Sequence, residues 1–389
     1  MIGCESRLKD EFRGAHFVIA AGHFDYFGGA ERQAILLAEQ LVSDYDCRVT
    51  FLGWGGDGML AQKARQVGCQ TVVFPLNLNQ ATWRKMIQMN ALAKFIRQSL
   101  KPDFLLPYVG MHCKIIGSIW RRTGAKFCWW NQRDEGRNIF GTRREHQLMR
   151  TLPAIVSNSY VGRDFLVRKF GLHENRVHVI NNGIVVPQPS EYGEWRQSYG
   201  VNPTDLVFTM VANLTKYKEH ATLLHAFANL KKTDAGQHAR LVLAGRHDDQ
   251  TLPLKALAYD LNLSHSVFMP GTLPHNEIQK LLTDSDLIVH SSTLEGCPNG
   301  ALEAMAQGRC VLGMDIPGMR QALGDEMAEE CLAPPKDTKG LTKRMISMAE
   351  SQQRRSILGD KNLHRIKSEF TVHKMVLKTL STIIDNRMM

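Results

Sequence analysis

Short apolar runs rich in β-branched residues alternate with longer amphipathic segments along all 389 residues of the chain. A strand that is apolar along its whole length is typical of a sheet whose two faces are both covered. When such strands alternate with helical patterns, the sheet is parallel and the helices lie on both of its faces. The alternation therefore predicts an α/β protein.

The alternation falls into two series. The first series of strands is predicted at residues 16–21, 47–54, 71–74, 103–108, 126–130, 154–158 and 177–180, and the second at 206–211, 239–244, 267–269, 287–290 and 310–314. Between them lies a stretch punctuated by Pro187 and Pro189. We therefore expect two doubly wound Rossmann-like lobes facing a cleft, with domains at residues 1–186 and 187–370.

Composition indicates the cellular compartment in which the chain is expected to function. No apolar run approaches the length of a membrane span, and residues 1–13 carry charges where a signal peptide needs an apolar segment. We expect a cytoplasmic protein. The eight cysteines form no C-x-x-C pair and most lie in apolar runs, so reduced, buried thiols are expected.

The net charge of +10 is unevenly distributed. Residues 1–186 carry 25 Lys and Arg against 15 Asp and Glu, whereas residues 187–389 carry 23 of each. A basic half suggests that one lobe meets an anionic partner, although a scattered solubilising charge is the alternative.

Three loops that follow strands carry groups suited to an anionic ligand. Gly28 and Gly29 precede the helical pattern of residues 31–42, and Lys218 precedes that of residues 220–231. Each can place backbone N–H groups or a positive charge beside a phosphate, although a glycine turn or a solvated lysine is also common.

The third loop is the most specific. Glu295 begins the sequence EGCPNGALE, in which Pro298 precedes a helix and Glu303 lies more than one turn inside it. The first N–H groups of that helix form an anion site, and the two carboxylates can accept hydrogen bonds from hydroxyls on either side of it. Paired carboxylates could instead serve hydrolysis as acid and base, but the placement favours a nucleotide-sugar.

This E-x7-E array resembles that of the family 4 retaining glycosyltransferases of GT-B fold. The segments GGAER at 28–32, SNSYVGRDFLVRKFGL at 157–172, VINNG at 179–183 and VHSS at 289–292 are also similar to that family. The resemblance implies that Gly28 and Gly29 lie against the donor diphosphate and that Lys218 stabilises the departing nucleotide diphosphate. It also implies that Glu303 holds the ribose, and that the helix within residues 371–389 crosses back to the first domain. The donor sugar and phosphate would be held by Glu295 and by the segment Gly296, Cys297, Pro298, Asn299 and Gly300.

Two positions depart from the family pattern. The arginine that usually precedes the lysine by five residues is Asn213 here, and Lys216 is a candidate for the missing charge. The histidine that usually faces the reacting sugar aligns with Tyr108, with His112 one turn later as a candidate sugar contact or a plain helix-start residue.

Retention of configuration requires no strong general base, because stabilising the leaving diphosphate is sufficient. We therefore expect no metal and no cofactor. Asp284-Ser285-Asp286 matches the D-x-D metal motif of the other glycosyltransferase fold, but its position just before a buried strand predicts a structural role.

Two further segments of the first domain concern its partners. Residues 83–101 form a basic amphipathic pattern with Met86, Met89, Leu92, Ala93 and Ile96 on one side, which would either rest on an anionic membrane or pack on the sheet. Arg133 and Arg137 would meet an acidic acceptor or pair with Asp134 and Glu135.

The sequence thus predicts transfer of a sugar from a nucleotide-sugar, in the first place a UDP-sugar, to a glycan or lipid-linked acceptor of cell-surface polysaccharide. A nucleotide-sugar epimerase or hydrolase of the same fold is one alternative. A non-enzymatic polyanion-binding protein is another, although Glu295 and Glu303 do not suit nucleic acid, and none is expected as partner.

Overall fold

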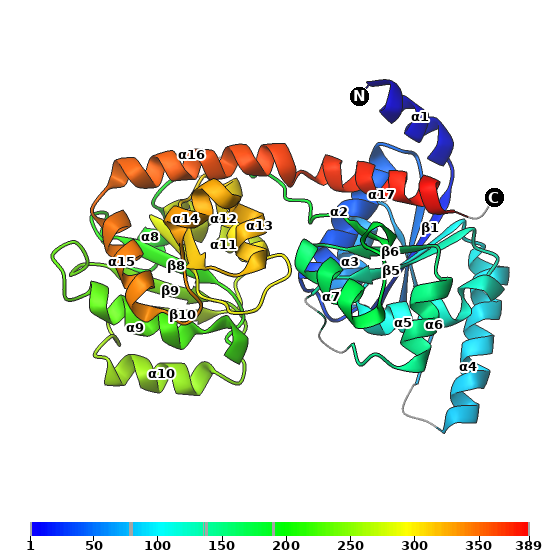
Figure 1. Ribbon diagram of the computed structural model, residues 1–389, viewed down its shortest axis with the longest axis horizontal. Helices are drawn as coiled ribbons and strands as arrows, with labels where there is room; N and C mark the ends of the chain where they lie inside the picture. Colours follow the sequence, from blue (N-terminus) through cyan, green and yellow to red (C-terminus); the bar gives the residue numbers. More distant parts are fainter. Residues whose placement is uncertain (1, 78–80, 135, 137–138, 189–190, 388–389) are drawn as a thin grey trace. The chain divides into compact units, whose positions relative to one another are not determined.

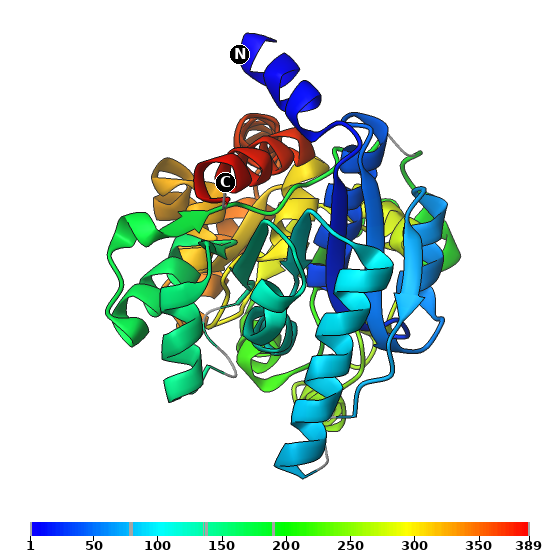
Figure 2. The same cartoon turned by 90° about the vertical axis from the view of Figure 1, so that its right-hand side faces the viewer.

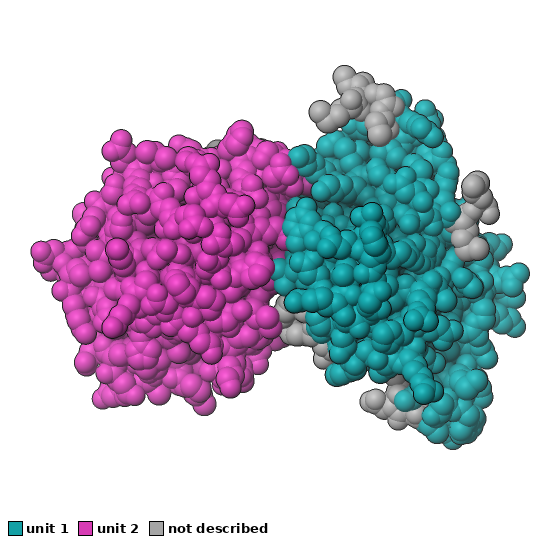
Figure 3. All heavy atoms as spheres, in the orientation of Figure 1, with its two compact units in different colours: residues 1–183, 372–389 teal, residues 184–371 magenta. Residues whose placement is uncertain are grey.

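The computed structural model describes residues 2–77, 81–134, 136, 139–188 and 191–387, without the side chains of residues 2–4. Contacts divide the chain into two compact units, coloured separately in Figure 3. Unit 1 comprises residues 1–183 and 372–389, and unit 2 comprises residues 184–371. The same elements are labelled in the ribbon of Figure 1.

The described part of unit 1 contains a parallel sheet of seven strands in the order β3-β2-β1-β4-β5-β6-β7. The central strand β1 pairs on both sides, with Val18 opposite Thr50 of β2 and Leu105 of β4. The strands are β1 (His16–His23), β2 (Arg48–Gly55), β3 (Gln70–Val73), β4 (Phe104–Pro107), β5 (Phe127–Gln132), β6 (Ala154–Ser157) and β7 (Val177–Val179).

Both faces of this sheet are buried, as the unbroken apolar strands predict. Phe17 and Ile19 of β1 pack into one core, with α1, α2, α3 and α17, whereas Val18 and Ala20 pack into a second core with α4, α5, α6 and α7. The helices of unit 1 are α1 (Ile2–Phe12), α2 (Gly29–Ser43), α3 (Met59–Gln66), α4 (Thr82–Phe95), η1 (Ile96–Leu100), α5 (Gly110–Ile119), η2 (Trp120–Arg122), α6 (Arg143–Thr151), α7 (Tyr160–Phe170), η3 (Glu174–Arg176) and α17 (Val372–Asn386).

Unit 2 repeats the architecture, and its described residues form a parallel sheet of six strands in the order β10-β9-β8-β11-β12-β13. Its strands are β8 (Val207–Val211), β9 (Arg240–Ala244), β10 (Val267–Gly271), β11 (Leu287–His290), β12 (Val311–Met314) and β13 (Leu332–Ala333). Its helices are α8 (Glu194–Ser198), η4 (Lys216–Lys218), α9 (His220–Leu230), α10 (Thr251–Asp260), α11 (His275–Asp284), α12 (Asn299–Ala306), α13 (Pro317–Leu323), α14 (Asp325–Cys331), α15 (Thr338–Ala349) and α16 (Gln352–Glu369).

The boundary between the units differs by three residues from the expected one at residue 187. The N–H of Ile184 donates to the carbonyl of Phe370 at 2.7 Å, and Ile184 bridges to Thr371, so residues 184–186 belong to unit 2.

None of the cysteines whose side chains are described is in a disulfide bond, and all of them are buried except the half-buried Cys297. Cys4 lies outside the described side chains. Across the described residues, we find no helix that combines the length and the apolar character needed to cross a bilayer.

Candidate functional site

The order of the strands locates one site in each unit. In unit 2 the chain order reverses between β8 and β11, and in unit 1 it reverses between β1 and β4. Ligands of doubly wound sheets bind beyond the carboxyl ends of the strands at this reversal. The predicted site residues of unit 2 follow β8 and β11, and those of unit 1 follow chiefly β1 and β4.

In unit 2, Lys218 and Glu295 form an ion pair although they are separated by 77 positions in sequence. The loops that carry them are bound to each other. Ser291 Oγ donates to the Lys218 carbonyl at 3.0 Å, and the Thr293 N–H donates to the Tyr217 carbonyl at 3.1 Å. The structure therefore brings together the two residues predicted to bind the leaving diphosphate and the sugar.

This pair is largely removed from solvent, with side-chain exposures of 14% for Lys218 and 10% for Glu295. Burial by itself raises the pKa of Glu295, but the charge of Lys218 and the nearby His290 and Ser292 together lower it below its ordinary value. Glu295 is thus a carboxylate at neutral pH and can accept hydrogen bonds from hydroxyl groups.

Two buried histidines flank the pair, and sequence reasoning missed both. His290 ends β11 with its Nε2 3.8 Å from Glu295 Oε1, and burial lowers its pKa to about 4. His220 begins α9, and burial, together with His290 and Lys218, lowers its pKa to about 3. A histidine that ends the apolar run LIVH was the available signal.

The backbone between Glu295 and α12 is packed so closely that glycine is required. A Cβ on Gly300 would collide with the carbonyl of Val211 at the end of β8, and one on Gly318 would collide with the carbonyl of Glu295. Pro298 is the N-cap of α12. These contacts fix the first turn of that helix at the carboxyl end of β8. Glu303 lies half-buried in α12, while Cys297 and Asn299 lie half-buried in the loop and the first turn.

Asn213 stands where the family usually has an arginine, and two cations are candidates for the missing charge. Asn213 is exposed, and its Oδ1 accepts the N–H of Arg246 at 3.2 Å. Lys216 is exposed in η4. Arg246 is a second cation near Asn213, but its guanidinium pairs with Asp248 at 2.8 Å.

In unit 1, the glycine loop already holds a carboxylate. Gly28 is the N-cap of α2, and its N–H donates to Glu31 Oε2 at 3.1 Å. Glu31 is 5% exposed, and burial raises its pKa. Gly29 begins the helix. A diphosphate at Gly28 would therefore meet Glu31 as well as the helix N-terminus.

The loop after β4 is strained at Val109, which has φ 68° and ψ 145°. This conformation is unfavourable for a β-branched residue, and such strain is concentrated at functional sites. Tyr108 and His112, the two predicted sugar contacts on either side of Val109, have different environments. Tyr108 is 2% exposed, and burial raises its pKa to about 12. His112 Nδ1 donates to the Tyr108 carbonyl at 2.6 Å, and burial lowers the pKa of His112, which is therefore neutral.

Arg133 contacts neighbours within unit 1. Its guanidinium lies 5.5 Å from the centre of the Tyr108 ring and donates to Asn182. An internal cavity of about 10 Å³, the room for roughly one water, is lined by Tyr108, Asn131 and Arg133 among others. Arg137 and Glu135 lie outside the described residues, and Asp134 accepts bonds from Gln132 and Gly136.

Both aspartates of the D-x-D motif make contacts that hold other parts of unit 2. Asp284 is fully buried and accepts the N–H groups of Gly193, Trp195 and Arg196 at 2.7, 2.8 and 3.1 Å. Asp286 pairs with Arg196 at 2.6 Å and accepts the N–H of Val207 at 2.8 Å. Among the described residues, no group of three or more His, Cys, Asp or Glu is placed to hold a metal ion.

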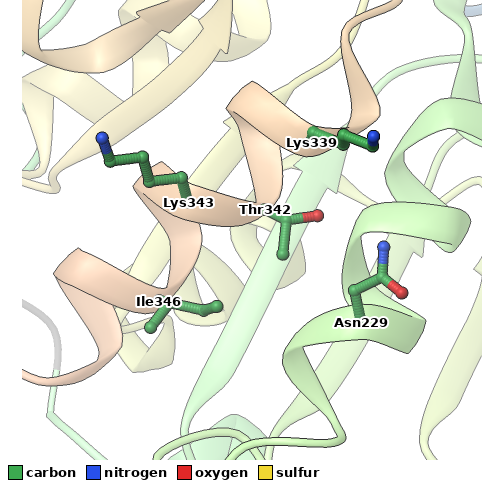
Figure 4. A pocket seen from close by; sticks show the side chains of 5 residues that line it. All are labelled: Asn229, Lys339, Thr342, Lys343 and Ile346. Atoms are coloured by element: carbon green, nitrogen blue, oxygen red, sulfur yellow. The ribbon is translucent and has the colours of Figure 1, made fainter.

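A surface hollow of about 410 Å³ in unit 2 lies elsewhere, between α9 and α15 (Figure 4). It contains none of the predicted site residues and is lined by Asn229, Lys339, Thr342, Lys343 and Ile346. The candidate site therefore rests on the loops at the strand reversal.

Two family models of glycosyltransferases match this chain, one chiefly in each unit. The family model described as "Glycosyltransferase Family 4" matches residues 27–188, and the one described as "Glycosyl transferases group 1" matches residues 191–365.

Curated relatives match over shorter segments. An uncharacterized glycosyltransferase of Methanocaldococcus jannaschii is 29% identical over 167 residues, which is 41% of this chain and 41% of the relative. A D-inositol 3-phosphate glycosyltransferase of Rhodococcus opacus is 27% identical over 186 residues, 46% of this chain and 42% of the relative. The matched segments span less than half the length of these relatives.

Solved structures match over nearly the whole chain. HepE of Anabaena, solved in complex with UDP, has a TM-score of 0.80 at 18% identity and covers 96% of this chain and 100% of its own. The same protein in complex with UDP-glucose gives 0.79 at 17% identity, covering 95% and 99%. At these identities the likeness concerns the fold.

Proposed function

Because the chain belongs to the family 4 glycosyltransferases and has their two-lobed GT-B fold, we propose that it is a retaining enzyme that uses a nucleotide-sugar donor. The donor class we favour is a UDP-sugar, and the acceptor class is a glycan or a lipid-linked sugar of cell-surface polysaccharide. The observation that carries the proposal is the buried pair of Lys218 and Glu295 at the strand reversal of unit 2.

In this proposal each group has one task. Lys218 leaves Glu295 and binds the diphosphate, together with the N-terminal backbone of α12. Glu295 then accepts hydrogen bonds from hydroxyls of the donor sugar, and Glu303 from those of the ribose. Support comes from the packing of Gly300, which holds the α12 end against β8, and of Gly318, which lies against the backbone of Glu295.

The proposed reaction exchanges one bond at the anomeric carbon for another. The bond between this carbon and the diphosphate oxygen breaks, and a bond to the acceptor oxygen forms on the same face. The acceptor proton passes to the departing diphosphate oxygen. Lys218 and the helix end stabilise the charge that develops there, and this chemistry would need no metal.

Epimerisation or hydrolysis of a nucleotide-sugar remains the alternative within this fold, since water can take the place of the acceptor. The polyanion-binding alternative would use unit 1, which carries 28 Lys and Arg against 16 Asp and Glu, but it gives no task to the buried pair of Lys218 and Glu295 in unit 2.

The test measures donor binding and donor turnover separately. UDP-glucose, UDP-galactose and UDP-N-acetylglucosamine are screened for thermal stabilisation of the full chain, and hydrolysis of the best donor is then followed. Lys218→Met and Glu295→Gln should each lower turnover by about 100- to 1000-fold, the typical loss when a charge-stabilising group is removed.

Surface variants provide a matched control. Lys280 and Glu277 form an ion pair on α11 at 3.4 Å with roughly one third of each side chain exposed. Lys280→Met and Glu277→Gln should leave turnover unchanged. Normal turnover in folded Lys218→Met and Glu295→Gln would refute the proposed site.

We also propose that unit 1 rests on an anionic membrane through the first turns of α4. The structure divides the predicted amphipathic helix: Leu92, Ala93 and Ile96 are buried against the sheet, whereas Met86 is 62% exposed. Trp83 and Ile87 are each 59% exposed beside it. This end of α4 projects at the lower edge of unit 1 in both ribbon views (Figures 1 and 2).

Charge complementarity favours a membrane as the partner of this surface. Residues 58–133 contain 12 Lys and Arg and one acidic residue, Asp103. Exposed apolar side chains beside cations suit the boundary between anionic head groups and acyl chains. Sugars carried by lipids would be presented there.

Vesicle flotation tests this proposal. The chain should bind vesicles of phosphatidylcholine with phosphatidylglycerol, and less well at high salt. Replacing Trp83, Met86 and Ile87 by Ser should weaken binding at least tenfold, because each buried apolar side chain contributes about 1.5–3 kcal/mol. Replacing the exposed Leu252 and Tyr259 of α10 by Ser is the control. Equal loss in both variants, or no binding, would contradict the proposal.

A further inference from the structure

His290 is placed to be a second partner of Glu295. Its Nε2 lies 3.8 Å from Glu295 Oε1, a distance slightly too long for a hydrogen bond. The ring is 2% exposed, and its Nδ1 has no hydrogen-bond partner among the residues that the structure describes. A buried polar group with an unused nitrogen calls for a role.

The proposed function creates a conflict at Glu295. Without donor, Lys218 neutralises this carboxylate. When Lys218 binds the diphosphate, Glu295 stays in a largely buried position beside an additional negative ligand. A buried charge that loses its partner is strongly destabilising. Glu295 therefore needs another donor at the moment when it must hold the sugar.

We propose that His290 is a positioning residue that closes onto Glu295 when Lys218 moves to the donor diphosphate. A small rotation of either side chain brings the two atoms into hydrogen-bond range. His290 would then fix the carboxylate for the sugar hydroxyls without touching the donor itself. This inference rests on the proposed donor site.

The charges around His290 determine what accompanies this exchange. Lys218 of η4 lowers the pKa of His290 and Glu295 raises it, while His220 of α9 lies close enough for His290 to affect its pKa. Donor binding neutralises Lys218 and adds negative charge, so the pKa of His290 rises from about 4. Donor binding is therefore accompanied by partial proton uptake, which increases as the pH is lowered.

Calorimetric titration measures this uptake. UDP-glucose is titrated into the full chain at pH 6.5 and pH 8 in buffers of different ionisation enthalpy. Both phosphates of UDP-glucose are diesters without a proton that titrates in this range, so any uptake comes from the protein. We expect uptake at pH 6.5, little at pH 8, and none at either pH in His290→Asn.

His220→Asn is the matched control, since His220 is equally buried in the same unit. It should keep the uptake. Kinetics provide a second readout, because His290→Asn should lower kcat at least tenfold with less effect on KM, and His290→Gln should restore part of the loss.

The outcomes separate two failures. If UDP-glucose does not bind, or binds equally well to Lys218→Met, the proposed donor site is wrong. If it binds through Lys218 but without proton uptake, or with the same uptake in His290→Asn, the role of His290 alone is refuted.

Discussion

At the scale of single residues, Glu31 in the glycine loop is expected to make the stability of the fold depend on pH. Glu31 is 5% exposed, its carboxylate accepts the N–H of Gly28, and the charge of Arg133 offsets part of the cost of burial. Because burial raises its pKa, ionisation of Glu31 is less favourable in the folded protein than in the unfolded chain. The resulting loss of stability is absent below the ordinary pKa of a glutamate and appears as the pH rises through the folded value.

We therefore predict that Glu31→Gln raises the midpoint of thermal unfolding at pH 7.5 and leaves it nearly unchanged at pH 4. The amide oxygen can still accept the Gly28 N–H, while the cost of the buried charge is removed. Glu39→Gln, on the exposed side of the same helix, should have no effect at either pH. A lower midpoint for Glu31→Gln at pH 7.5 would mean that its charge stabilises the fold through Arg133.

The residues of the unit 2 site were predictable from sequence, but their contacts were not. Glu295 and Lys218 stand in loops that follow buried strands, which is a local pattern. Their pairing depends on the crossing of two loops that are 77 residues apart. The position of His290 at the end of the apolar run LIVH was a signal, but its role was not predictable, because that role depends on the distance of its ring from Glu295.

At the scale of elements, Asp284 attaches the short helix α8 to the end of α11. Its side chain ends α11 and accepts three backbone N–H groups at the start of α8. Helix α8 has only five residues, so it depends on this contact rather than on its own hydrogen bonds.

We predict that Asp284→Ala destabilises the protein by about 3–5 kcal/mol, since three N–H groups would lose a buried charged acceptor. Thermal unfolding measures the loss, and Asp260→Ala, an exposed aspartate at the end of α10, serves as control. At a temperature where the variant is folded, its affinity for UDP-glucose should equal that of the wild type.

The absence of a metal requirement is tested on the wild type. Turnover that stops with EDTA and returns with Mn²⁺ would contradict the metal-free proposal.

The elements themselves were largely predictable, because both faces of each sheet are buried and the strands read as unbroken apolar runs. All twelve predicted strands form. Strand β13 was not predicted, since it has two residues and pairs only through Leu332 and Ala333 with β12. The pattern of residues 83–101 forms two elements, α4 and the π-helix η1, and its buried residues Leu92, Ala93 and Ile96 lie on both sides of their boundary.

For the whole molecule, unit 1 is discontinuous in sequence, and its second segment contains α17, the helix that the resemblance expects to return to the first domain. Helix α17 follows all of unit 2, yet Met375, Val376, Leu380 and Ile383 are buried in the core formed by β1, α2 and α3. With this helix, unit 1 has 28 Lys and Arg against 16 Asp and Glu, a net charge of +12, whereas unit 2 has −2. The excess charge thus belongs to the unit that is expected to meet the acceptor.

This division predicts that the two units unfold separately. Each has its own core, and Leu380 and Leu341 are both fully buried, the first in unit 1 and the second in unit 2. Leu380→Ala should lower the unfolding transition of unit 1 by about 2–5 kcal/mol, and Leu341→Ala should do the same to that of unit 2. UDP-glucose should raise the unit 2 transition more than that of unit 1, because its proposed ligands Lys218, Glu295 and Glu303 lie in unit 2. Scanning calorimetry checks all three effects, and a single transition that responds equally to both substitutions would show that the units unfold as one.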